Sequence, residues 1–147
     1  MYLKLSQGLK LKKRMIGEIN TLKNQISKNN SYLSVNKPSY DVNDLYQKWQ
    51  NKLNKYIELK AMIIVANNPI QQLIFKLAEL KAMISFYNSL PINKGKQTSY
   101  GGEMVEWDSQ FDDVKRDSLI STCEKEIESI QDNLDRFNYE TEINFTE

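Results

Sequence analysis

Residues 42–87 read VNDLYQKWQNKLNKYIELKAMIIVANNPIQQLIFKLAELKAMISFY, and this stretch decides the fold. Apolar and aromatic residues recur in it at steps of three and four, the spacing that places side chains on one face of an α-helix. The pattern stops at Pro69, which lacks a backbone N–H and suits the first turn of a new helix. The stretch therefore predicts two amphipathic helices, with Asn68 as the N-cap of the second. Because the connection is short, we expect them to be antiparallel neighbours, forming a central helical hairpin over residues 42–90.

Near the predicted apex of this hairpin, residues 61–66 read AMIIVA and are apolar on every side. A helix that contacts water along one face carries polar residues on that face. We therefore expect this segment to be covered on several sides, by other helices or by a second subunit. This pattern predicts that the protein is a homo-oligomer.

The flanking sequence adds two further helices and one irregular segment. Residues 1–30 form a basic helix, residues 91–108 a loop or β-hairpin rich in turn formers, and residues 109–147 an acidic helix and tail. We predict an all-α fold, an elongated antiparallel helical bundle of four main helices with a short β-hairpin or extended loop between helices three and four. Residues 1–147 are expected to form a single helical domain. The expected helices cover residues 3–29, 42–66, 70–89 and 109–137.

Composition limits the chemistry that this chain can perform. The 147 residues include no His and one Cys, which excludes an intrachain disulfide, a Cys/His zinc site and a His-based acid–base pair. Cys123 lies on the apolar stripe of the last helix and is expected to be a buried structural thiol. The carboxylates of that helix are spread along its surface. We therefore expect no metal site, no cofactor and no catalytic residue.

Hydropathy and charge narrow the partners. No run reaches the ~18 apolar residues that a membrane span needs, and we expect a cytoplasmic protein without a signal peptide. Residues 1–30 have a net charge of +6 and residues 103–147 a net charge of −10, so the first and last helices are expected to attract each other. That pairing leaves no broad basic face, and we expect no DNA or RNA binding.

A glycine-bearing loop, residues 93–102, has the features of an anion site. Positive charge, hydroxyl donors, a ring that can stack and a permissive backbone occur together in it. It lacks the spacing of a P-loop or of a dinucleotide fingerprint, and a flexible β-hairpin without a ligand is the alternative. The residues expected to bind the anion are Lys94, Lys96, Thr98, Ser99 and Tyr100.

A second wall for this predicted site is expected from residues elsewhere in the chain. The candidates are Asn67 and Asn68 at the hairpin apex, or a basic cluster contributed by a neighbouring subunit. The basic cluster consists of Lys12, Lys13 and Arg14.

Short motifs along nearly the whole chain carry a resemblance to a known family. Their positions are Leu5, Leu9 and Asn29; Ile63 and Asn67; Leu73, Leu77 and Glu79; Ser99, Tyr100, Glu103 and Met104; and Asn138, Thr141, Glu142 and Ile143. Through these motifs the chain resembles the septicolysin-like family of small bacterial and phage proteins. Tyr139 stands where the family pattern has Trp. The resemblance implies a helical, oligomeric fold and brings no catalytic residues.

Three functions remain open from the sequence. The first is a non-enzymatic oligomer that binds a small anionic ligand, such as a signalling nucleotide that a phage protein sequesters from host immunity. The second is a helical adaptor that binds another protein through an exposed apolar stripe. The third is a hydrolase that uses carboxylates and a metal ion.

Overall fold

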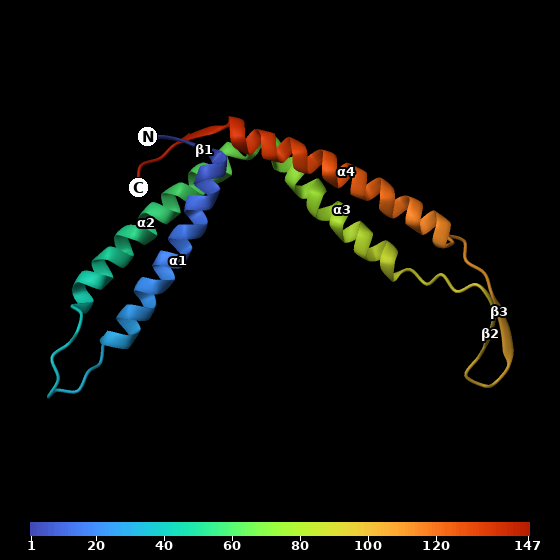
Figure 1. Ribbon diagram of the computed structural model, residues 1–147, viewed down its shortest axis with the longest axis horizontal. Helices are drawn as coiled ribbons and strands as arrows, with labels where there is room; N and C mark the ends of the chain where they lie inside the picture. The colour runs from blue at the N-terminus through green and yellow to red at the C-terminus, as the bar shows by residue number, and fades with distance from the viewer. The chain divides into compact units, whose positions relative to one another are not determined.

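Helices make up most of the chain in the computed structural model, which describes residues 1–147 (Figure 1). The helix-dominated fold with four main helices is confirmed, and two small antiparallel strand pairs accompany them. None of the helices has both the length and the apolar character that crossing a membrane requires. The elements in chain order are β1 (Tyr2–Lys4), α1 (Leu5–Asn29), α2 (Val42–Ala66), the 3₁₀ turn η1 (Asn68–Ile70), α3 (Gln71–Ser89), β2 (Gly95–Thr98), β3 (Met104–Trp107), α4 (Asp113–Glu140) and β4 (Glu142–Asn144).

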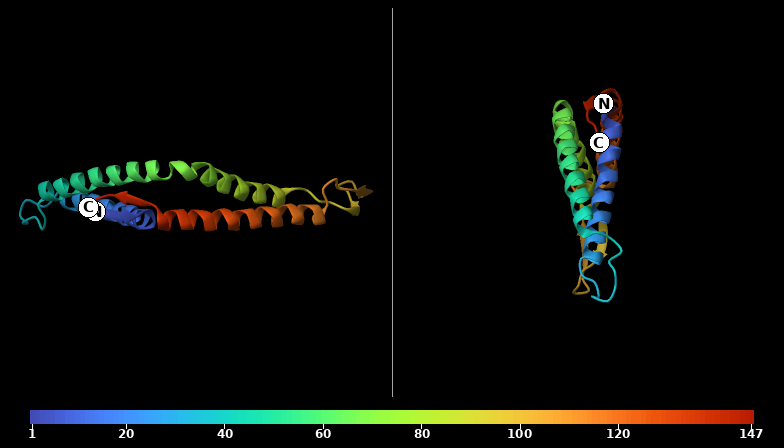
Figure 2. Two further views of the ribbon diagram at one scale, coloured as in Figure 1. Left: turned by 90° about the horizontal axis from the view of Figure 1, so that it is seen from above. Right: turned by 90° about the vertical axis from the view of Figure 1, so that its left-hand side faces the viewer.

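The chain divides into two units, each with its own internal contacts. Unit 1 consists of Met1–Pro69 and Asp135–Glu147, and unit 2 consists of Ile70–Leu134. The boundary falls inside the segment 42–90 that the sequence predicted as one helical hairpin. The helix that packs along α2 is α1, and the two lie side by side in Figure 1 and Figure 2. The single domain expected over the whole chain stays a prediction.

The bounds of α2 agree with the expected helix over residues 42–66. Its start is fixed by Asp41, whose carboxylate accepts a hydrogen bond of 2.9 Å from the backbone N–H of Asn43. The apolar stripe supplies its buried face, because Leu45, Leu59 and Ile63 are buried. A local cap and a one-sided stripe together specify this helix.

Unit 1 contains a strand pair that the sequence did not predict. Residues 3 and 4 were expected to be helical, but β1 is extended and pairs antiparallel with β4, so that Leu3 lies opposite Ile143. The ladder continues beyond the strands, since Leu5 N donates to Thr141 O and Phe145 N donates to Met1 O. Residue 5 is therefore the first that is free to begin α1. The core of unit 1 consists of Leu5, Met15, Leu59, Ile63, Ile143 and Phe145.

The predicted apex is only partly covered. Ile63 is buried, whereas Ile64 and Val65 are 61% and 74% exposed. Coverage of these two side chains by a second subunit stays a prediction. The N-cap expected at Asn68 is wrong, because Asn68, Pro69 and Ile70 form a 3₁₀ turn and α3 begins at Gln71.

Unit 2 contains α3, the β2–β3 pair and most of α4. An ion pair between Lys76 and Glu126 links α3 to α4. The start of α4 differs from the expected residue 109, because the Asp112 carboxylate accepts from the Lys115 backbone N–H and places the first turn at Asp113. Cys123 is a free buried thiol, as predicted.

Candidate functional site

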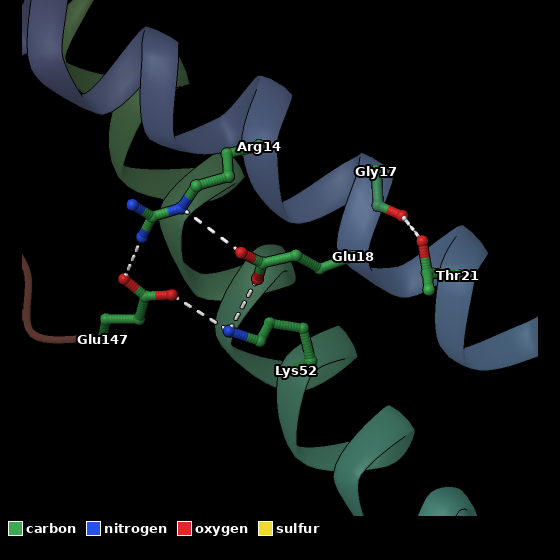
Figure 3. Close-up of polar contacts among 6 residues, drawn as sticks. All are labelled: Arg14, Gly17, Glu18, Thr21, Lys52 and Glu147. Carbon is green, nitrogen blue, oxygen red and sulfur yellow. Dashed lines mark hydrogen bonds and ion pairs between the residues drawn. The ribbon is translucent and has the colours of Figure 1, made fainter.

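Four charged side chains of unit 1 meet beside α1 and α2 and form a cluster of alternating sign (Figure 3). Lys52 Nζ lies 2.8 Å from Glu18 Oε2 and 2.9 Å from Glu147 Oε1. Arg14 Nε lies 3.4 Å from Glu18 Oε1, and its Nη2 pairs with the second carboxylate oxygen of Glu147. Each cation therefore contacts both carboxylates. We call Arg14, Glu18, Lys52 and Glu147 the charge cluster.

Three separate segments position this cluster. Arg14 and Glu18 are four residues apart on α1 and so share one helix face, while Lys52 projects from the neighbouring helix α2. Glu147 is brought there by the segment after β4, in which the Phe145 ring is 1% exposed and anchors the chain in the core. Lys55 adds a further tie, since its Nζ donates to the Thr146 carbonyl at 3.0 Å. The cluster thus depends on tertiary packing and on no local motif.

The interactions in the cluster stabilise its charged forms. Hydrogen bonds from Lys52 to Glu18 and to Glu147 raise the pKa of the Lys52 ammonium above its ordinary value. The hydrogen bond from Lys52 is also the main cause that lowers the pKa of the Glu147 carboxyl, and Arg14 contributes to the same shift. At neutral pH the cluster therefore presents two cations that already hold two carboxylates, those of Glu18 and Glu147.

A cavity of about 700 Å³ adjoins the charge cluster, and we call it the α2 cavity. Most of its lining comes from one face of α2, with one apolar residue from α1 and Glu147 from the tail. The side chains of Lys48, Asn51 and Asn54 make no hydrogen bond or ion pair within the chain, so their donors are available to a ligand. The lining residues are Leu22, Lys48, Asn51, Lys52, Asn54, Lys55, Glu58 and Glu147.

The loop residues predicted to bind an anion lie together on the β2–β3 hairpin of unit 2. Lys96 stands opposite Glu106 in the strand register, and Thr98 stands opposite Met104 and donates to its sulfur at 3.5 Å. Ser99 lies at the hairpin turn, where its backbone N–H donates to Glu103 O, and Tyr100 in the same turn is fully exposed.

The environment near Lys94 is acidic. A hollow of about 230 Å³ there is lined by Ile92, Lys94, Asp108, Ser109, Asp112 and Asp113. Three carboxylates beside one ammonium favour a cation over an anion. The expected donors lie together at the hairpin, but the hollow beside Lys94 does not have the charge that an anionic ligand needs.

The residues predicted as a second wall belong to unit 1. Asn67 caps the end of α2, Asn68 lies in the 3₁₀ turn, and Lys12 and Lys13 lie on α1. Arg14 is the one predicted site residue that joins the charge cluster. No group of three or more Cys, Asp or Glu side chains is arranged to hold a metal ion.

The sequence did not single out the residues of the α2 cavity. Lys48, Lys52 and Lys55 follow a helical spacing that is visible in the sequence, but such a spacing is also that of an ordinary solvated helix face. Glu147 lies 95 residues beyond Lys52, and nothing local in the sequence connects them.

Comparison with known proteins gives one similar fold and no family. No family model and no curated protein matches the sequence. The chain is similar to a solved structure described as a functionally unknown conserved protein from Corynebacterium diphtheriae, with a TM-score of 0.76 and 12% sequence identity. The match covers 98% of this chain and 100% of that chain. At this identity the similarity shows the fold alone.

Proposed function

We propose that the protein is a non-enzymatic, homo-oligomeric helical protein that binds a small anionic ligand, such as a nucleotide, in the α2 cavity. The observation that carries this proposal is the seating of a carboxylate between Arg14 and Lys52 at the wall of that cavity. A site that already holds one anionic group by charge-assisted contacts has the chemistry to hold another.

The rest of the cavity supports a ligand larger than a simple anion. Its volume lies within the roughly 300–1,000 Å³ typical of small-molecule sites. Lys48 supplies a mobile positive charge, the side-chain amides of Asn51 and Asn54 supply neutral donors and acceptors, and Leu22 supplies apolar surface. A phosphate beside Arg14 and Lys52 with a planar group toward Leu22 would use all of these features.

In this proposal the protein binds the ligand and does not convert it. Both carboxylates of the cavity are paired with lysines, since Glu58 lies 3.5 Å from Lys55 and Glu147 lies 2.9 Å from Lys52. The pKa of the Glu147 carboxyl lies below its ordinary value, chiefly because Lys52 donates to it, and this makes Glu147 a weaker general base. Sequestration of the ligand, a cytoplasmic location and membership of the septicolysin-like family remain parts of this proposal.

Isothermal titration calorimetry with a panel of linear and cyclic nucleotides tests where the ligand binds. We expect Lys48→Ala/Asn51→Ala to weaken binding roughly 10- to 100-fold, since a hydrogen bond involving a charged group contributes about 1.5–3 kcal/mol. The matched control is Lys94→Ala/Lys96→Ala, which removes charge from the hairpin and should leave the affinity unchanged. The opposite pattern would move the site to the hairpin, and no binding by the wild-type protein would reject the ligand proposal.

A helical adaptor is the second candidate, because unit 2 exposes several large apolar side chains. Phe75 and Phe86 of α3 are 62% and 59% exposed, and Trp107 and Phe111 near the hairpin are 47% and 49% exposed. Exposed apolar surface of this kind marks interaction sites when it is contiguous. Mass spectrometry of the protein purified from cells separates the two functions, because a stoichiometric polypeptide supports the adaptor and a co-purified nucleotide supports the anion site.

A further inference from the structure

We infer that Glu147 is a built-in competitor of the anionic ligand, so that ligand binding displaces its carboxylate from Arg14 and Lys52. This inference rests on the proposed function and concerns the regulation of the same site. Glu147 both lines the α2 cavity and uses its two carboxylate oxygens on the two cations (Figure 3). A phosphate entering the cavity would compete with Glu147 for Lys52, which lines the cavity, and for Arg14, which lies on the other side of the Glu147 carboxylate.

The contacts of the tail allow Glu147 to leave without disrupting the core. The last buried anchor is Phe145, whose backbone N–H also donates to Met1 O at 2.9 Å. Beyond it, the Thr146 carbonyl accepts from Lys55 and the Thr146 hydroxyl accepts from the Met1 ammonium at 3.1 Å, whereas Glu147 makes its contacts through its side chain. Rotation of the Glu147 side chain is therefore enough to empty the position between the cations.

The cations keep a partner when Glu147 leaves. Glu18 lies 2.8 Å from Lys52 and 3.4 Å from Arg14, so neither cation becomes unpaired. The displaced carboxylate moves into water, and its side chain is already 38% exposed. Exposed ion pairs are weak. Glu147 can therefore occupy the site at low ligand concentration and still be displaced by a multiply charged anion.

The test compares binding of inorganic pyrophosphate to the wild-type protein, Glu147→Gln and Glu58→Gln by calorimetry. Both substitutions remove one negative charge from the cavity wall, but only Glu147→Gln removes the group that contacts Arg14 and Lys52. We expect Glu147→Gln to bind pyrophosphate about three- to tenfold more tightly than the wild type, and Glu58→Gln to change the affinity less than about twofold. Backbone NMR relaxation at residue 147 should show increased mobility when wild-type protein is saturated with pyrophosphate.

The outcomes separate this inference from the function on which it rests. Equal or weaker binding by Glu147→Gln, or an equal gain in both variants, would overturn the competitor while leaving the anion site in place. Absence of binding to all three proteins would overturn the anion site, and the competitor with it.

Discussion

Gly8 of α1 lies directly against Ile143 of β4. A Cβ atom added at Gly8 would lie 2.7 Å from Ile143 Cδ1, closer than Cβ atoms approach non-bonded atoms in proteins. The absence of a side chain at Gly8 therefore lets the Ile143 side chain pack against α1, with Leu59 of α2 close by. Gly17 in the same helix has no such neighbour, since an added Cβ would meet nothing within 4 Å.

This difference predicts opposite effects of two alanine substitutions. Gly17→Ala should raise the free energy of unfolding by about 0.5–1 kcal/mol, because alanine is the better helix former. Gly8→Ala gains the same helix propensity but overpacks the core, which costs about 1–3 kcal/mol. We expect it to lower the free energy of unfolding by up to about 2 kcal/mol. Urea denaturation measures both changes.

The control for Gly8→Ala removes the Ile143 atom that the added Cβ would meet. Ile143→Val deletes Cδ1, so Gly8→Ala in that background should no longer destabilise the protein and should regain its helix-propensity gain. An equal cost of Gly8→Ala in both backgrounds would show that some contact other than Cδ1 is responsible.

Acid should remove the contribution of Glu147 to stability. Its folded-state pKa lies below the ordinary value of 4.5, chiefly because Lys52 donates to the carboxylate. A depressed pKa contributes stability that is present above pH 4.5 and is lost as the pH falls through the folded pKa. Because the side chain is more than one third exposed, we expect wild type to exceed Glu147→Gln by at most about 1 kcal/mol at pH 7. The difference should shrink as the pH falls below 4.5, and a difference that stays constant from neutral to acid pH would contradict the ion pair.

Because the Cys123 thiol is buried, we expect it to react slowly with disulfide reagents. Cys123 is 4% exposed on α4, so a disulfide reagent such as dithionitrobenzoate should modify it only when the surrounding structure opens. We expect a rate in native buffer that is at least about a hundredfold below the rate in 6 M guanidinium chloride. Rapid modification of the native protein would show that α4 is not covered at this position.

The exposed apolar side chains of α3 predict association. At micromolar concentration, light scattering should give a mass above the 17.2 kDa of one chain. Phe75→Ser/Phe86→Ser should lower that mass without changing the helical circular dichroism, because both rings are exposed in the single chain. A wild-type monomer would reject homo-oligomerisation through any surface.

The sequence predicts the helices well where the signals are local. The start of α2 lies at the Asp41 cap and its end follows the stripe that stops before Pro69, so both agree with the expected bounds. The starts of α1 and α4 were wrong by two and four residues, because extended residues and an Asp112 cap come first. β1 and β4 are three residues long and pair across the whole chain, so neither has a periodicity that a sequence pattern could reveal.

The candidate site was harder to predict for the same reason. The sequence predicted a site on the hairpin because Lys96, Thr98 and Tyr100 are close together in it. The charge cluster and the α2 cavity instead combine α1, α2 and Glu147, which only tertiary packing brings together. The prediction of helix α2 was correct, but the pattern of polar residues on its exposed face does not distinguish a binding surface from a solvated one.

The pairing of β1 with β4 has a consequence for the order of folding. Residues 2–4 are synthesised before unit 2, yet their partners at 142–144 are synthesised only after the whole of unit 2 has been made. Closing a loop of this length carries an entropy cost that local helix pairing does not. We expect α1 and α2 to pair early, before Ile143 can pack against Gly8. Ile143 and Phe145 then complete the core of unit 1 after unit 2 has been synthesised, so residues on both sides of unit 2 in the sequence are needed for that core.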